Sequence, residues 1–401
     1  MKAVVGELAR FGGTPEFRTP LRLGRPNIGD RARFFARLGG ALDRGWLSNG
    51  GPLVAEFEDR VARITGARHC VATCNATLAL QLAIRAAGWR GEVIVPALTF
   101  AATAHAVAWL GLTPVFCDVD PVTGGLDPGH AATLIGPRTS GILGVHLWGR
   151  GHRLDELTEL AHRHGIGLLF DAAHAFACSW RGRPIGSFGA AEVFSFHSTK
   201  FVHAFEGGAL VTDDDALAER ARSLRNFGLT GPDEVAQVGV NAKMSEASAA
   251  MGLTSVDSLE EFRAHNAHNH ARYTAGLAAA PGIRLLAFDP AEDNNFQYVV
   301  AEVDETVTGL GRDTLHEVLL AENVLARRYF HPGCHLMAPY RDGTRLPHTE
   351  ALAARSLALP TGTAVGAEQI DRLCRLLRFA ARNGRAIQDR IGAEPVIARA
   401  S

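Results

Sequence analysis

The sequence predicts an α/β protein with two domains: a large domain on a mostly parallel sheet and a small C-terminal α+β domain. Short apolar runs alternate with amphipathic helical segments from about residue 50 to 250, which is typical of a sheet wrapped by helices. That rhythm changes after about residue 255, and 401 residues exceed one ordinary hydrophobic core. We therefore expect a large domain over residues 1–255 and a small domain over residues 256–401.

The apolar runs of the large domain have the length and composition of buried strands. They are HCVATC (69–74), GEVIVPA (91–97), TPVFCDV (113–119), TSGILGVH (139–146), GIGLLFDA (165–172), AEVFSFH (191–197) and GGALVTD (207–213). Apolar residues at spacings of three and four predict helices between them. The clearest are ALQLAIRAAGW (79–89), AATAHAVAWLG (101–111) and LDELTELAHRHG (154–165). Strands that alternate with helices predict parallel pairing.

The C-terminal part mixes the two patterns differently. Helical segments at 258–279, 312–324 and 368–384 surround one extended segment at 295–305, which predicts the small α+β domain. We expect the residues after about Gly384 to form a loosely held tail.

Composition excludes several classes of protein. The formal net charge is −1 and no basic stripe occurs, so we expect no nucleic-acid partner. The N-terminal residues lack the apolar core of a signal peptide and no apolar stretch is long enough to span a membrane, so we expect a soluble, cytoplasmic protein. Six cysteines in a chain of this length predict free thiols, and we expect no metal site.

Lys200 is the first candidate for chemistry. It closes the apolar run VFSFHSTK and precedes the turn FVHAFEGGAL. Because burial disfavours the ammonium form, a lysine in apolar surroundings has a lowered pKa and becomes a nucleophilic amine. The alternative is a lysine at a strand end that simply reaches solvent.

Asp171 ends the run GIGLLFD, which places a carboxylate at the carboxyl edge of a parallel strand, where α/β sheets bind ligands. A carboxylate there suits the pyridine nitrogen of pyridoxal 5′-phosphate (PLP), because it keeps the ring protonated and electron-withdrawing. The alternative is an N-cap for a helix over AAHAFA. Asp171 and Lys200 together favour the PLP interpretation.

Further residues around this pair suit the phosphate and the ring of PLP. Ala76 and Thr77 lie between a strand and a helix, where backbone N–H groups bind anions, and the Ser195 hydroxyl is a further candidate. Phe100 follows a strand end and offers an aromatic face, and His174 is a candidate contact for the ring hydroxyl. For each of them a structural role is the alternative: a helix N-cap for Thr77, core packing for Phe100 and Ser195, and a polar turn for His174.

Seven ordered motifs resemble the DegT/DnrJ/EryC1/StrS family of PLP-dependent sugar aminotransferases. They are GWLSNGGPLVAEFE (45–58), CNATLAL (74–80), VPALTFAATAHAV (95–107), HLWGR (146–150), DAAHAF (171–176), FSFHSTKFVHAFEGGAL (194–210) and GVNAKMSEASAAMGL (239–253). The resemblance covers nearly the whole chain. It implies the type I PLP aminotransferase fold, similar to aspartate aminotransferase.

The resemblance also implies roles for single residues. Lys200 would carry PLP as a Schiff base and Asp171 would contact the pyridine nitrogen. Ala76, Thr77 and Ser195 would hold the phosphate, Phe100 would stack on the ring, and His174 would stand where many members have a glutamine. Asn241, within GVNAKM, would reach the cofactor phosphate of a neighbouring subunit, which implies a homodimer with shared sites; its alternative is a plain loop asparagine.

Within the family, the motifs are most similar to enzymes that aminate C4 of a dTDP-4-keto-6-deoxyhexose, of the desosamine-pathway and viosamine-forming type. This implies L-glutamate as donor, pyridoxamine 5′-phosphate as the intermediate form of the cofactor, and a place in deoxysugar and antibiotic biosynthesis. A 3-keto isomer or a 4-keto pentose stays open as the acceptor. A noncatalytic sensor and a decarboxylase or racemase are the alternatives of another class.

The nucleotide end of the substrate is less clear from the sequence. Arginine forks favour diphosphates and aromatic residues favour a base, so Arg150, Arg327, Arg328, Tyr329 and His331 are candidates. Exposed surface positions are the alternative for each of them.

Overall fold

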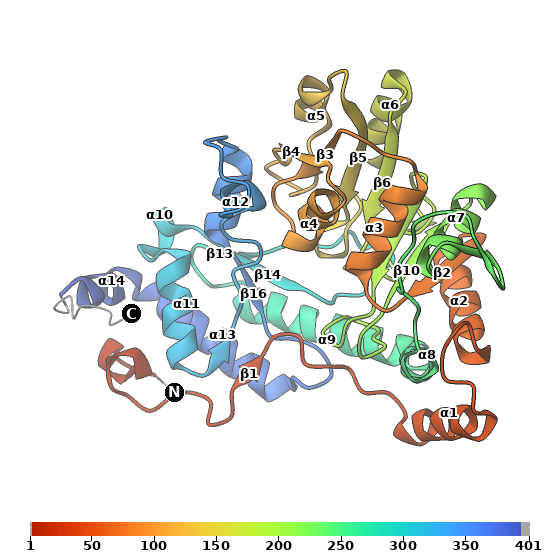
Figure 1. The fold of residues 1–401 in the computed structure, drawn as a ribbon. Helices are drawn as coiled ribbons and strands as arrows, with labels where there is room; N and C mark the ends of the chain where they lie inside the picture. The colour runs from red at the N-terminus through yellow and green to blue at the C-terminus, as the bar shows by residue number, and fades with distance from the viewer. Residues whose placement is uncertain (1, 394–401) are drawn as a thin grey trace.

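A computed structural model describes residues 2–393 (Figure 1), and its largest sheet has seven strands. The strands are β2 (His69–Thr73), β3 (Glu92–Pro96), β4 (Thr113–Cys117), β5 (Thr139–Val145), β6 (Gly167–Asp171), β9 (Ala191–Ser195) and β10 (Gly208–Thr212). Their order is β2-β10-β9-β6-β5-β3-β4, and only β10 runs antiparallel to its neighbours. The predicted, mostly parallel sheet is confirmed.

Helices cover both faces of the sheet because its strands are apolar on both sides. One face carries α3 (Ala76–Ala86), α4 (Ala101–Trp109) and α7 (Asp215–Arg225). The other carries α2 (Pro52–Thr65), α5 (Pro128–Leu134), α6 (Leu154–His164) and α8 (Glu246–Asp257). Along β3, Val93 and Val95 pack on the first layer while Ile94 packs on the second. This alternation makes a three-layer α/β core.

The C-terminal elements form a second hydrophobic cluster around a small antiparallel sheet. The sheet has the order β13 (Ile283–Leu285), β14 (Val299–Val303) and β16 (Ser356–Leu359). The helices of this part are α9 (Leu259–Leu277), α10 (Glu305–Thr308), α11 (Arg312–Ala321), α12 (Pro347–Arg355), α13 (Ala367–Arg382) and α14 (Gly384–Gly392). The expected α+β mixture is therefore present.

The N-terminal segment joins the two clusters. Leu8, Phe17 and Leu21 are buried among the C-terminal helices, and β1 (Leu21–Arg22) pairs with β15 (Val324–Leu325). In Figure 1 the red segment then reaches α1 (Arg31–Arg44) at the opposite side of the molecule. The division at residue 255 stays a prediction, because the hydrophobic clusters do not separate the chain at one point.

Smaller elements complete the described chain. Two short hairpins are β7 (Ser179–Trp180) with β8 (Arg183–Pro184) and β11 (Leu229–Gly231) with β12 (Glu234–Val235). Within residues 2–393, no helix combines the length and the apolarity that a membrane crossing requires.

The prediction of a loose tail after Gly384 is wrong for residues 385–392. They form α14, and Ile387 is fully buried in the C-terminal cluster. Gly384 allows this turn of the chain, because a Cβ at that position would lie 2.0 Å from the carbonyl oxygen of Thr308. Residues 394–401 of the predicted tail lie outside the described residues.

Asp118, which directly follows β4 of the seven-stranded sheet, contacts α12. Its Oδ1 accepts hydrogen bonds from the Thr349 N–H at 2.7 Å and the Thr349 hydroxyl at 2.8 Å, and its Oδ2 accepts from the His348 N–H at 3.0 Å. Asp118 thus caps the N-terminus of a helix that follows it by more than 200 residues in sequence. Burial opposes the ionised form, but these hydrogen bonds outweigh it and lower the pKa of Asp118.

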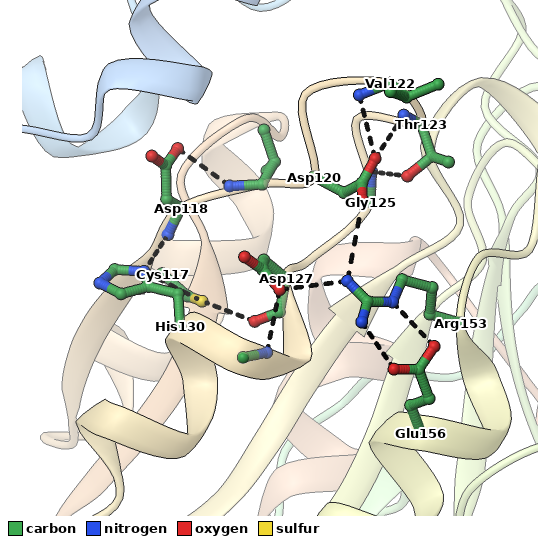
Figure 2. Close-up of polar contacts among 12 residues, drawn as sticks. Cys117, Asp118, Asp120, Val122, Thr123, Gly125, Asp127, His130, Arg153 and Glu156 are labelled. Carbon is green, nitrogen blue, oxygen red and sulfur yellow. Dashed lines mark hydrogen bonds and ion pairs between the residues drawn. The ribbon is translucent and has the colours of Figure 1, made fainter.

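A network of polar contacts fixes the loop that carries Asp118 (Figure 2). The Asp118 N–H donates to His130, and Asp120 accepts from the N–H groups of Val122 and Thr123. Arg153 pairs with Asp127 at 3.2 Å and, through two nitrogens, with Glu156. The loop therefore holds the Asp118 carboxylate at a defined place between the two parts of the molecule.

We predict that Asp118→Ala lowers the free energy of unfolding at pH 7 by about 2 kcal/mol, because three donors of α12 and the Val119 N–H lose a charged acceptor. Urea titration measures this difference. Asp304→Ala is the control, since Asp304 is an exposed N-cap of α10 and its loss should lower the free energy of unfolding less than Asp118→Ala does.

Because the folded pKa of Asp118 is lowered, its stabilisation is present above the unfolded pKa of about 3.9 and is lost as the pH falls below it. The difference in the free energy of unfolding between wild type and Asp118→Ala should therefore become smaller below about pH 4. A constant gap from pH 7 to pH 3 would contradict the assignment.

Candidate active site

A cavity of about 410 Å³ lies where β5, β6 and β9 end, with Val145, Asp171 and Ser195 in its wall. The segment that follows β15 supplies the opposite wall through Arg327, Tyr329 and Phe330. Seven of the eight predicted site residues line this cavity, all except Asn241: Ala76, Thr77, Phe100, Asp171, His174, Ser195 and Lys200. Residues from four separate stretches of the chain therefore meet at one edge of the sheet.

Lys200 lies in the turn between β9 and β10, five residues beyond the strand end at which it was predicted. It lines both the large cavity and a smaller neighbouring one. Burial lowers the pKa of Lys200 to about 8, although the Asp171 charge opposes that shift. At pH 7 roughly a tenth of Lys200 is therefore the neutral, nucleophilic amine, and this fraction rises to about half near pH 8.

Asp171 is buried at the end of β6, and two donors hold its carboxylate. Oδ2 accepts a hydrogen bond from the Thr103 hydroxyl at 2.7 Å, and Oδ1 accepts one from the Ala173 N–H at 3.0 Å. Burial raises the pKa of Asp171, while Thr103, Ala173 and Lys200 oppose the rise. The alternative of a helix N-cap is wrong, because turns and not a helix follow Asp171.

The N-terminus of α3 points its first-turn N–H groups at the cavity. Asn75 is the N-cap, with its Oδ1 accepting from the Leu78 N–H at 2.9 Å, so the alternative of Thr77 as the cap is wrong. The N–H groups of Ala76 and Thr77 have no carbonyl partner within the helix. Gly208 lets β10 approach closely, since a Cβ there would lie 2.5 Å from the Ala76 nitrogen. This end of the cavity suits a phosphate.

Ser195 adds a hydroxyl to the same cavity. It is the last residue of β9, it is nearly buried, and its Oγ accepts only a long contact of 3.4 Å from the His197 N–H. The hydroxyl proton of Ser195 therefore remains available to an acceptor in the cavity.

Several aromatic rings line the cavity, among them Phe100, His174 and Phe330. Phe100 immediately precedes α4, lines the cavity and is 59% exposed, so its ring is open to a bound ligand. His174 lies parallel to Phe330, with ring centroids 5.8 Å apart and an interplanar angle of 6°. The cavity therefore offers aromatic faces on which a planar heterocycle can pack.

His174 is neutral and its tautomer is defined by a backbone contact. Burial, assisted by the Lys200 charge, lowers the pKa of His174 well below its usual value. The Trp148 N–H donates to Nδ1 at 3.3 Å, so the proton of the neutral ring is on Nε2. His174 therefore offers a donor, as a glutamine amide would, rather than a positive charge.

Together these residues fit PLP. The open N–H groups of α3 and the Ser195 hydroxyl match its phosphate, and the exposed Phe100 ring matches its aromatic face. The buried Asp171 carboxylate and the half-buried Lys200 amine complete the set. Each of these groups thus corresponds to one chemical feature of the cofactor. The residues of this cavity therefore fit PLP.

The structure separates the nucleotide candidates. Arg327 and Tyr329 line the cavity, and Arg327 lies over the Tyr329 ring. Arg328 pairs with Asp313 at 2.9 Å, and His331 is exposed outside the cavity. Arg150 is largely buried and donates to the carbonyl oxygens of Thr123 and Ala287, which gives it a structural role.

Asn241 does not reach the cavity of its own chain. It is exposed and forms a β-bridge with Asn226, next to the residues that connect to β2. A role for Asn241 at a neighbouring subunit stays a prediction.

Sequence reasoning missed Thr103 and Tyr298. Thr103 contacts Asp171 across 68 positions of sequence, and Tyr298 lines the cavity from the start of β14. The only available signal was the position of Thr103 three residues after Phe100 on the same helical turn. It does not predict contact with a distant carboxylate.

Comparison with known proteins agrees with this site. The model of the DegT/DnrJ/EryC1/StrS aminotransferase family matches residues 29–378. The dTDP-4-amino-4,6-dideoxy-D-glucose transaminase of Escherichia coli is 31% identical over 88% of this chain and 96% of its own length. The GDP-perosamine synthase of Caulobacter vibrioides is 35% identical over 83% of this chain and 91% of its own length.

A solved structure extends this agreement to the whole fold. The crystal structure of DesI in the presence of its TDP-sugar product has a TM-score of 0.94 and 56% sequence identity, and the match covers 97% of this chain and 100% of DesI. The expected type I aminotransferase fold is thus confirmed. The chain belongs to the DegT/DnrJ/EryC1/StrS aminotransferase family of PLP-dependent sugar aminotransferases.

Proposed function

We propose that this enzyme transfers an amino group from L-glutamate to C4 of a dTDP-4-keto-6-deoxy sugar, giving a dTDP-4-amino sugar for deoxysugar biosynthesis. The observation that carries the proposal is one cavity that brings together Lys200, Asp171 and the open N-terminus of α3. The 56% identity to DesI, which was crystallised with its TDP-sugar product, supports the sugar nucleotide as substrate.

Lys200 has two roles in this proposal. It is the residue to which PLP would be attached. Once the amino group of the donor has displaced it, the freed Lys200 amine would take the proton from Cα of the donor and later deliver a proton to C4 of the sugar. When bound, PLP supplies an aldehyde that takes up the amino group and a ring that withdraws electrons from the reacting carbon. With a pKa of about 8, Lys200 can both accept and release a proton near neutral pH.

The other cavity residues orient the cofactor. Asp171 contacts the pyridine nitrogen, Ala76, Thr77 and Ser195 hold the phosphate, and Phe100 covers one face of the ring. Each assignment follows from the chemistry of the group that the residue presents to the cavity.

His174 and Arg327 complete the proposed contacts. His174 donates its Nε2 proton to the ring hydroxyl. Arg327 supplies a positive charge at the wall formed with Tyr329, where an anionic group of either substrate would pair with it.

The active unit in this proposal is a homodimer, with Asn241 reaching the cofactor phosphate of the partner subunit. An apolar surface on and beside α1 supports an interface. It comprises Ile28, Phe35, Leu42, Trp46, Leu47 and Phe205, each between 44% and 59% exposed. Phe205 contacts α1 through Phe34 and is adjacent to Glu206, which lines the cavity, so this surface is continuous with the site.

Other acceptors within the same chemistry are a 3-keto isomer or a 4-keto pentose attached to a nucleotide. A noncatalytic sensor of PLP or sugar nucleotide is the alternative of another class, and the lowered pKa of Lys200 argues against it, since a sensor has no need of a reactive amine.

We predict that borohydride reduction of the PLP-loaded enzyme attaches the cofactor to Lys200 alone. The sequence contains two other lysines, Lys2 and Lys243, which serve as internal controls in peptide mapping by mass spectrometry. Lys200→Ala should lose this label and lower transamination at least about 10³-fold, because it removes the proton-transfer group. Label on Lys2 or Lys243 in place of Lys200 would contradict the proposal.

We predict that the rate of PLP attachment to the apoenzyme rises with pH and levels off above about pH 8, because only the neutral Lys200 amine attacks the aldehyde. Stopped-flow absorbance at saturating PLP measures this, with Nα-acetyl-lysine as the control for titration of PLP itself. Asp171→Asn should move the midpoint to lower pH, because the Asp171 charge raises the pKa of Lys200. A midpoint at the ordinary lysine value of about 10.4 would exclude a desolvated Lys200.

We predict that L-glutamate without a sugar acceptor yields one equivalent of 2-oxoglutarate per active site and then stops. Single-turnover assays of the resulting pyridoxamine form against a panel of keto-sugar nucleotides should give amination at C4, read by NMR. Continuous conversion of glutamate would indicate a decarboxylase or racemase, and no conversion would indicate a sensor. Amination at C3 would leave the chemistry intact and change the regiochemistry.

A further inference from the structure

We propose that Thr103 is the positioning residue of the active-site carboxylate: with Thr99 it forms a hydroxyl chain that orients Asp171 toward the cofactor ring. The proposal deepens the proposed function and rests on the assignment of Asp171 to the pyridine nitrogen. Nothing in the motifs or in the family resemblance assigned a role to either threonine.

The chain consists of two short hydrogen bonds in a buried environment. The Thr103 hydroxyl donates to Asp171 Oδ2 at 2.7 Å, and the Thr99 and Thr103 hydroxyl oxygens are 2.9 Å apart. Thr103 is fully buried and Thr99 is 2% exposed. Water therefore does not compete for these hydroxyl groups from the surface.

The direction of the chain follows from the charge of Asp171. An ionised carboxylate has no proton to donate, so Thr103 must donate to it. The Thr103 oxygen is then free to accept the Thr99 hydroxyl proton, which polarises the Thr103 O–H group and strengthens its bond to Asp171. Thr99 thus supports Thr103, and Thr103 contacts the carboxylate.

The acceptor of the Thr103 hydroxyl differs from that of several other threonines in helices. Threonines in other helices, such as the buried Thr65 and Thr254 and the exposed Thr158, donate to the carbonyl oxygen four residues earlier. For Thr103 that carbonyl belongs to Thr99, and it accepts from the Cys334 thiol at 3.3 Å instead. The Thr103 hydroxyl is therefore directed away from its own backbone and at Asp171.

Two fixed donors leave the carboxylate little rotational freedom. The Ala173 N–H holds Oδ1 and the Thr103 hydroxyl holds Oδ2. Each oxygen retains a second lone pair, and the side chain lines the cavity. The same turn of chain from Thr99 to Thr103 also carries Phe100, so one helix start positions both the aromatic face and the carboxylate.

The test is Thr103→Val, which retains the shape of the side chain and removes the hydroxyl. We expect PLP affinity to fall about 10- to 100-fold, the range for a carboxylate that loses one hydrogen bond, and the NMR signal of ¹⁵N-labelled PLP to shift toward the unprotonated ring nitrogen. Thr103→Ser should restore both values. Thr99→Val should give a smaller change in the same direction.

A purely structural role would lower the melting temperature without moving the ¹⁵N signal. The proposal is therefore wrong if Thr103→Val has the wild-type PLP affinity and ¹⁵N signal. If Thr103→Val does not fold, the same two quantities are measured for Thr103→Ala. Asp171→Asn separates the two levels of inference. If Asp171→Asn also leaves the ring nitrogen protonated, the assignment of Asp171 fails; if it shifts the signal while the Thr103 variants do not, only the role of Thr103 fails.

Discussion

The active site depends on the burial of two groups of opposite charge in one cavity. Burial raises the pKa of Asp171 and lowers that of Lys200, while each charge opposes the shift of the other. Moving the two groups apart would therefore favour the neutral acid and the neutral amine still more. The arrangement brings a carboxylate and a partly neutral amine into one cavity, and the charge of each group limits the pKa shift of the other.

Enclosure of this pair depends on contacts between distant parts of the chain. The segment from Arg327 to Phe330 lines the cavity. Four residues after Phe330, a hydrogen bond from the Cys334 N–H to the Ala97 carbonyl oxygen, at 2.7 Å, connects this part of the chain to the end of β3. Asp118 caps α12 from the end of the neighbouring strand. The low polarity of the site is thus a property of the assembled fold and not of any single motif.

The sequence predicted the elements and the residues whose positions follow from local pattern. Lys200 and Asp171 end apolar runs, so their approach to one sheet edge followed from parallel pairing, although Lys200 lies in a turn beyond its strand. Thr103 was missed because its partner Asp171 is distant in sequence. Arg150 was predicted as a nucleotide contact, but its guanidinium donates to the carbonyl oxygens of Thr123 and Ala287, which are also distant in sequence. Residues 385–392 were predicted to be a loose tail, but they form α14, which packs on the C-terminal cluster through the buried Ile387. Each difference reflects tertiary contact, which periodicity does not encode.

The single antiparallel strand of the large sheet has a consequence for Lys200. Because β10 reverses direction, β9 ends and β10 begins at the same edge, with Ser195 opposite Gly208 in the ladder. Residues 196–207 therefore form a closed loop whose two ends are joined by strand pairing, and no crossover over a sheet face is needed. Closure of so short a loop limits the conformational entropy that Lys200 could gain by opening. Length changes within this loop would alter the reach of the amine while leaving the sheet unchanged.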